Sequence, residues 1–198
     1  MARSPDTRSD DELVRAFRGG DDIALEALYY RHRGPVFTWL RALARDSAAA
    51  EDLLQDVWVK IVRGIGGYQG GNFKSWMWRI ARNVAIDHAR RRKDLTILDA
   101  PVGEGEGATS LAEMIPDDRA VDAIARLDAE ERRIAVRSAL AELSPPLREV
   151  MVLRLESDLK FREIAALMKL PLGTVLARMN SATRKMREIL VGKGVENG

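Results

Sequence analysis

Residues 73–93 form the most strongly basic stretch of the chain. The segment FKSWMWRIARNVAIDHARRRK holds seven Lys or Arg residues, one histidine and a single acid, Asp87. Cations can neutralise phosphates, an aromatic ring can stack on an unpaired base, and an amide can hydrogen-bond a base edge. This combination suggests contact with nucleic acid. A solvated amphipathic helix is the alternative for the segment taken alone.

The spacing within this segment predicts a helix with one side in a core. Apolar residues recur three and four positions apart, which is the period of a packed helix. They are Phe73, Trp76, Met77, Ile80, Ala81 and Val84. We expect the other sectors to face outward, and they carry Lys74, Trp78, Arg79, Arg82, Asn83, Asp87 and Arg90. Asn72 can cap the start of this helix.

Several short helices are expected before the basic one. Ser9 and Glu12 form a capping-box pattern, and Gly19-Gly20 end the first helix. A second helix follows Asp21-Asp22, and a third is expected to start at Pro35. Short loops between such helices predict a compact α-helical domain over residues 9–93.

A longer helix is expected from Ser47 to the glycines at 64–67. Its predicted inward stripe is Leu53, Leu54, Val57, Ile61, Val62 and Ile65. Its outward face is mixed in charge and consists of Glu51, Asp52, Gln55, Asp56 and Lys60. An ordinary solvated surface accounts for such a face equally well.

The net charge of +2 averages segments of opposite sign. Residues 94–131 contain eleven acids against two arginines, with many small residues and two prolines. This composition predicts a flexible acidic linker. It is either a passive tether or a nucleic-acid-mimicking or channel-filling strand whose acids keep it away from the basic modules until a partner binds.

The helical period returns in residues 132–191. One helix is expected near Ile134, another starts at Pro145, and two more flank a turn at Lys169-Leu170-Pro171. Two short helices joined by such a turn favour a helix-turn-helix, although a simple helical hairpin would look similar. The second is expected to present Thr174, Leu176, Ala177, Arg178, Asn180, Ser181, Arg184, Lys185 and Arg187 outward. The predicted fold is therefore all-α, with two small helical domains.

Composition argues against several other classes of protein. The chain has no cysteine, which excludes disulfides and thiol chemistry, and two histidines make a His-based metal site unexpected. We expect no cofactor and no enzyme activity, because the acids lie mainly in the linker or opposite cations. No run approaches the roughly 18 apolar residues of a membrane span, and the N-terminus lacks a secretion signal, so we expect no membrane insertion and a cytoplasmic location.

Four segments together resemble a known family. EDLLQDVWVKI, the basic stretch, LSPPLREVMVLRL and FREIAALMKLPLGTVLARM are similar in order and spacing to bacterial alternative sigma factors of the extracytoplasmic-function (ECF) group. The resemblance covers nearly the whole chain outside the linker. It implies a protein that binds core RNA polymerase and promoter DNA and directs transcription initiation. Residues 9–93 would be a region 2-like domain and residues 132–191 a region 4-like domain.

The resemblance also implies residue roles. Polymerase docking would fall to Asp52, Gln55, Asp56 and Lys60. Contacts with the −10 promoter element would fall to Lys74, Trp78, Arg79, Arg82, Asn83, Asp87, Arg90 and Arg91. Contacts with the −35 element would fall to Thr174, Leu176, Ala177, Arg178, Asn180, Ser181, Arg184 and Lys185. Trp76 is expected in the core because it belongs to the apolar stripe.

The C-terminal helix departs from the family pattern. The family usually has a cation in place of Leu176, Ser in place of Ala177, and an aromatic residue or His followed by Arg in place of Asn180-Ser181, so we expect weak −35 recognition. Lys169 replaces a glycine common in the turn, where a left-handed backbone would cost roughly 1 kcal/mol.

Two further hypotheses concern partners. A helix-turn-helix regulator that binds duplex DNA without polymerase would explain the C-terminal domain, but it leaves the two N-terminal motifs unexplained. The exposed basic and docking faces also suggest a partner that covers them, an anti-sigma factor.

Overall fold

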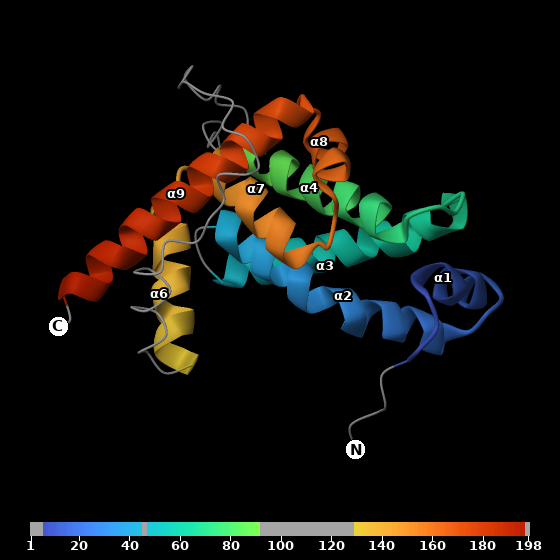
Figure 1. The fold of residues 1–198 in the computed structure, drawn as a ribbon. Coiled ribbons are helices and arrows are strands. Elements are labelled where there is room, and N and C mark those ends of the chain that lie inside the picture. The colour runs from blue at the N-terminus through green and yellow to red at the C-terminus, as the bar shows by residue number, and fades with distance from the viewer. Residues whose placement is uncertain (1–5, 45–46, 92–128, 197–198) are drawn as a thin grey trace. The chain divides into compact units, whose positions relative to one another are not determined.

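The regular elements of the protein are helices throughout the part of the chain that can be described. The computed structural model describes residues 6–44, 47–91 and 129–196 (Figure 1). The elements are α1 (Asp10–Arg18), α2 (Asp22–Leu43), α3 (Ser47–Gly64), the short 3₁₀ helix η1 (Ile65–Gly67), α4 (Phe73–Arg91), α6 (Ala129–Glu142), α7 (Pro145–Glu156), α8 (Phe161–Met168) and α9 (Leu172–Glu196). The predicted all-α fold is confirmed.

The chain divides into two compact units. The first comprises Met1–Asp94 with Leu155–Leu159, and the second comprises Leu95–Arg154 with Lys160–Gly198. Nearly all of the expected linker, residues 94–131, lies outside the described residues. α6 begins at Ala129, inside that range.

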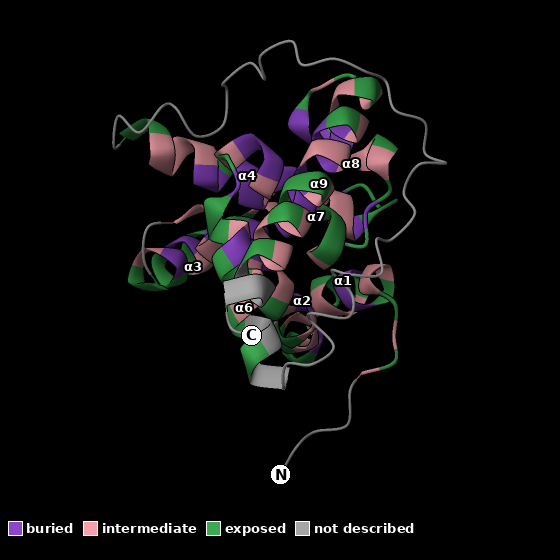
Figure 2. Cartoon of the chain, turned by 60° about the vertical axis from the view of Figure 1, so that its left-hand side comes forward, coloured by how far each residue is buried: buried purple, intermediate pink, exposed green. Residues whose placement is uncertain are grey.

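In the first unit, α4 packs against three other helices. It contacts α1, α2 and α3, while α2 also packs against both α1 and α3. The core contains the fully buried side chains of Leu28, Trp39, Ile61 and Met77. Figure 2 marks both buried and exposed residues along α3 and α4. Each of these helices therefore has an inner face for packing and an outer face left for contacts.

The start and end of α1 follow the predicted pattern. The Ser9 backbone N–H donates to Glu12 Oε2 at 2.7 Å, and the Glu12 N–H donates back to Ser9 Oγ at 3.3 Å. This is the reciprocal capping box. Gly19 caps α1 after its last residue, Arg18, and Gly20 has φ of +96°, a conformation that glycine adopts without steric cost.

The prediction of two separate helices around Pro35 was wrong. α2 runs unbroken from Asp22 to Leu43 with Pro35 inside it. An internal proline removes one backbone hydrogen bond and costs roughly 3 kcal/mol. Leu28 and His32 before the proline and Val36 after it are all buried. Packing of this continuous stripe outweighs the local penalty.

The second unit contains the predicted helix-turn-helix. α8 and α6 both pack against α9, whose residues Val175 and Ala182 are fully buried. α8 is followed by its C-cap Lys169, which has φ 56° and ψ 42°. This is the left-handed conformation anticipated for the turn. With a lysine in place of glycine it costs roughly 1 kcal/mol.

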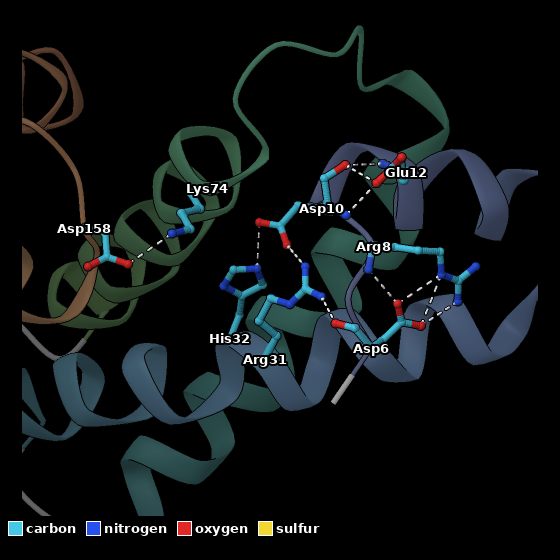
Figure 3. Close-up of polar contacts among 9 residues, drawn as sticks. Asp6, Arg8, Asp10, Glu12, Arg31, His32, Lys74 and Asp158 are labelled. Atoms are coloured by element: carbon cyan, nitrogen blue, oxygen red, sulfur yellow. Dashed lines mark hydrogen bonds and ion pairs between the residues drawn. The ribbon is translucent and has the colours of Figure 1, made fainter. Parts of the chain in front are cut away.

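An ionic cluster ties α1 to α2 (Figure 3). Arg31 Nη1 donates to Asp10 Oδ1 at 2.6 Å, and His32 Nε2 lies 2.9 Å from Asp10 Oδ2. Arg31 also donates through Nη2 to the carbonyl oxygen of Asp6 at 2.7 Å. Burial alone would raise the pKa of Asp10, but the contacts with His32 and Arg31 outweigh it and lower this pKa. The folded state therefore favours the ionised carboxylate.

We predict that Asp10→Asn destabilises the protein in a pH-dependent way. At pH 7 the free energy of unfolding should fall by about 1–3 kcal/mol, because buried donors lose a charged acceptor. Since the folded-state pKa of Asp10 is lowered, its stabilisation is present above the unfolded pKa of ~3.9 and is lost as pH falls through the folded value. Urea denaturation across pH should therefore show the two proteins converging below ~pH 4. Asp22→Asn, at an exposed acid on α2, is the control and should change little.

Candidate nucleic-acid and partner interfaces

The outer face of α4 is polar and cationic. Arg79, Asn83 and Asp87 follow each other at intervals of four residues and so lie along one line of the helix. Arg79 and Asn83 are exposed and Asp87 is partly exposed. Arg90 and Arg91 are exposed near the end of the helix, and Lys74 is partly exposed in its first turn. These six expected −10 residues are all accessible.

Two other residues expected on this face lie inside. Trp78 is 1% exposed, and its ring packs edge-on against Trp39 of α2, with centroids 5.6 Å apart. Arg82 is 8% exposed. The expectation that both face outward was wrong. Because α4 packs against three helices, its buried face is wider than a stripe facing one neighbour.

The start of α4 is fixed as predicted. The Ser75 backbone N–H donates to Asn72 Oδ1 at 3.0 Å, so Asn72 caps the helix. Trp76 is half-buried, with its ring centroid 5.3 Å from that of Tyr68 and 5.7 Å from that of Phe73. Trp76 thus belongs to an aromatic cluster at the base of the helix, but it lies at the edge of the core and is not fully buried as expected.

The outer face of α3 combines charge with apolar surface. Asp52, Gln55, Asp56 and Lys60 are all exposed, as expected. Val59 and Val62 are exposed as well, at 47% and 42%. The prediction that Val62 points inward was wrong. The inward stripe is centred on Leu53, Val57 and Ile61, and Val62 is turned about 100° from Ile61.

The outer faces of α3 and α4 meet at one ion pair. Lys60 Nζ lies 3.6 Å from Asp87 Oδ2, and both side chains are about half exposed, at 49% and 48%. Such an exposed pair contributes only ~0–1 kcal/mol. The pair matters because it shows that a candidate docking residue, Lys60, lies beside a candidate −10 residue, Asp87.

The second helix of the helix-turn-helix, α9, has fewer accessible cations than expected. Arg178 is 6% exposed, so the expectation that it faces outward was wrong. It lies three residues after buried Val175 and four before buried Ala182, on the inner side of the helix. The other expected residues are exposed or partly exposed, namely Thr174, Leu176, Ala177, Asn180, Ser181, Arg184, Lys185 and Arg187.

One exposed cluster on α2 was missed by the sequence reasoning. Tyr29 and Tyr30 pack edge to face with centroids 5.5 Å apart, and the Arg33 guanidinium lies 5.1 Å from the centroid of the Tyr30 ring. Tyr29 also contacts Trp58 of α3, with ring centroids 5.1 Å apart. The sequence did carry a signal for this cluster, because two aromatic residues and an arginine lie about one helical turn apart.

Other site types are not represented in the described parts of the chain. Within them, no group of three or more His, Cys, Asp or Glu residues could hold a metal ion. No helix in these ranges is long and apolar enough to cross a membrane.

Comparison with known proteins agrees with this arrangement. The family model for sigma-70 region 2 matches residues 28–94, and the model for sigma-70 region 4 matches residues 133–186. The chain is 34% identical over 178 residues to the RNA polymerase sigma factor CarQ of Myxococcus xanthus, which covers 89% of this chain and 95% of CarQ. It is 25% identical over 179 residues to the ECF sigma factor SigW of Bacillus subtilis, which covers 89% of this chain and 94% of SigW.

A solved structure shares the fold. It is the sigma factor RpoE of Bartonella quintana in complex with the anti-sigma factor NepR, with a TM-score of 0.59 and 23% identity, covering 83% of this chain and 95% of that one. The two matched regions and the nearly full-length relatives agree with the two helical units seen here. The chain belongs to the ECF group of sigma-70 family RNA polymerase sigma factors, which bind core RNA polymerase and direct transcription initiation at promoters.

Proposed function

We propose that this sigma factor docks on core RNA polymerase through the outer face of α3 and contacts the −10 promoter element through the outer face of α4. The observation that carries the proposal is the juxtaposition of these two faces at the Lys60–Asp87 pair. On this proposal, residues 9–93 are a region 2-like domain, residues 94–131 a linker and residues 132–191 a region 4-like domain. The protein acts in the cytoplasm and has no catalysis of its own.

The proposed docking surface has the anatomy of a protein interface. Val59 lies among the charged or polar Asp52, Gln55, Asp56 and Lys60, and Val62 continues the exposed apolar surface about one turn further along α3. Apolar cores with polar rims are typical of specific interfaces. The four rim residues are those assigned to docking from the family resemblance, and the two valines extend that set.

The proposed −10 surface contains residues for phosphate contacts and residues for base contacts. Arg79, Arg90 and Arg91 are exposed cations suited to phosphates, with Lys74 at the other end of the helix. Asn83 and Asp87 can hydrogen-bond base edges. Trp78 and Arg82, which lie inside, support this surface from beneath instead of contacting DNA directly.

The −35 contact is proposed to be weaker. Thr174, Asn180 and Ser181 can reach base edges or backbone, while Arg184 and Lys185 suit phosphates. Leu176 and Ala177 add no charge, and Arg178 is buried. The α9 surface therefore has fewer cations at its start than the family pattern.

We predict that Asp56→Arg weakens binding to core polymerase by roughly tenfold or more, because it reverses a charge at the edge of the docking surface. Val59→Asp should act in the same direction by placing a charge at the apolar centre. Co-elution with core polymerase and run-off transcription from a promoter-fragment library measure both effects, with circular dichroism as the check on folding. Glu188→Arg, at an exposed acid on α9, is the matched control. Normal binding by both α3 variants would show that this face is only solvated surface.

Two substitutions on α4 should have different signatures. Arg79→Ala should weaken binding of the reconstituted holoenzyme to −10 DNA about equally for all sequences and reduce the salt slope by ~1. Asn83→Ala should cost about 1–3 kcal/mol and relax preference at one base position. Fluorescence titrations with promoter forks selected by the wild type measure both. Arg15→Ala on α1 is the control, and a salt slope unchanged by Arg79→Ala would remove Arg79 from the phosphate contacts.

We also propose that an anti-sigma factor covers the docking surface. The support is the exposed apolar pair Val59 and Val62 and the likeness to an RpoE that was solved with the anti-sigma factor NepR. Affinity purification of the native chain should yield two separate complexes, one with polymerase and one with a smaller partner. A purification that yields polymerase subunits alone contradicts this proposal.

A further inference from the structure

Arg18, the last residue of α1, binds the turn between α3 and α4. Its Nε and Nη2 donate to the carbonyl oxygen of Ile65 at 2.9 and 2.6 Å. Nη2 also donates to the carbonyl oxygen of Gly66 at 2.9 Å and to that of Tyr68. These carbonyls belong to η1 and the residue after it, where few backbone donors remain; the Ile65 carbonyl also accepts from the Tyr68 N–H at 3.3 Å. A guanidinium there satisfies the acceptors and complements the negative end of the helix.

A second contact joins α1 to the same turn. The Tyr68 hydroxyl donates to Asp11 Oδ1 at 2.7 Å, and the Tyr68 side chain is buried. Burial and this hydrogen bond both raise the pKa of Tyr68, so the hydroxyl stays protonated and able to donate. α1 thus binds the turn at two kinds of group. Arg18 binds backbone carbonyls of the turn, and Asp11 binds the side chain of Tyr68.

The turn at residues 65–68 packs against the start of α4. The Tyr68 ring centroid lies 5.9 Å from that of Phe73 and 5.3 Å from that of Trp76, both in the first turn of α4. A Cβ on Gly64 would lie 3.2 Å from Trp76 Cζ2, so the end of α3 also packs closely on this cluster. A shift of residues 65–68 would therefore be transmitted to the start of α4.

We propose that the contacts of α1 with residues 65–68, which we call the brace, hold the start of α4 in position for −10 DNA. Arg18 of α1 and Tyr68 of the turn are the positioning residues of this brace. This inference rests on the proposed −10 contact by α4. α1 itself is unsuited to phosphate because its first turn carries Asp10, Asp11 and Glu12. The brace acts through the turn and touches no DNA.

The brace should be separable from polymerase docking. The docking residues lie between Asp52 and Val62 on the outer face of α3, whereas Arg18 binds carbonyls beyond Gly64. Loss of the brace therefore loosens the turn and the start of α4 while the docking surface stays in place.

The test uses the full chain reconstituted with core polymerase and a promoter fork selected by the wild type. Arg18→Ala should weaken fork binding by about tenfold, and Tyr68→Phe, which keeps the ring but loses the hydroxyl, by about threefold. Core affinity and the salt slope should stay unchanged for both. Arg15→Ala, the neighbouring exposed arginine of α1, is the matched control.

The salt slope and core affinity decide between explanations. A slope that falls by ~1 in Arg18→Ala would make Arg18 a phosphate contact and overturn the brace. Equal losses of core and DNA affinity would mean a general structural role, and unchanged fork binding in both variants would mean no role. If Arg18→Ala does not fold, Arg18→Lys and Tyr68→Phe are measured in its place. Weaker fork binding with unchanged core affinity and salt slope is again the expected result. Failure of the −10 contact itself is recognised separately, because Arg79→Ala and Asn83→Ala would then have no effect.

Discussion

The first unit depends on how α4 is buried. Three helices pack against it, and the buried ring of Trp78 packs edge-on against that of Trp39 of α2. Seven residues of α4 are buried, while Arg79 and Asn83 are exposed and Asp87 is partly exposed along one line of the helix. On the proposed function, a rigid helix presents these side chains to DNA with little loss of conformational entropy on binding.

The same packing brings the two proposed partner surfaces together. α3 packs against α4, and the Lys60–Asp87 pair marks where their outer faces meet. On the proposed function, polymerase and −10 DNA are bound at the same time, which requires both faces on one rigid body. The contacts of Arg18 and Asp11 with the turn at 65–68 connect α1 to this body as well, next to the start of α4.

The second unit combines a helix-turn-helix with a proposed −35 surface that has few accessible cations near its start. The helix-turn-helix forms even though Lys169 must adopt a left-handed backbone, which shows that burial of residues such as Val175 and Ala182 outweighs the local strain. The outer face of α9 has no accessible cation at residues 174–181, because Arg178 is buried. On the proposed function, this weakens the −35 contact.

The sequence by itself predicted the family, most of the helices and several of their caps, because hydrophobic period, capping residues and motif order can be read from the chain without its packing. The capping box at Ser9, the Asn72 cap and the turn at Lys169 could all be predicted in this way, as could the accessible Asp52, Gln55, Asp56, Arg79 and Asn83. Tertiary structure alone decided the continuity of α2 through Pro35, the burial of Trp78, Arg82 and Arg178, the exposure of Val62 and the contacts of Arg18. The reason is that a helical stripe shows which residues can be buried, whereas the number and direction of the neighbouring helices decide how wide the buried face becomes.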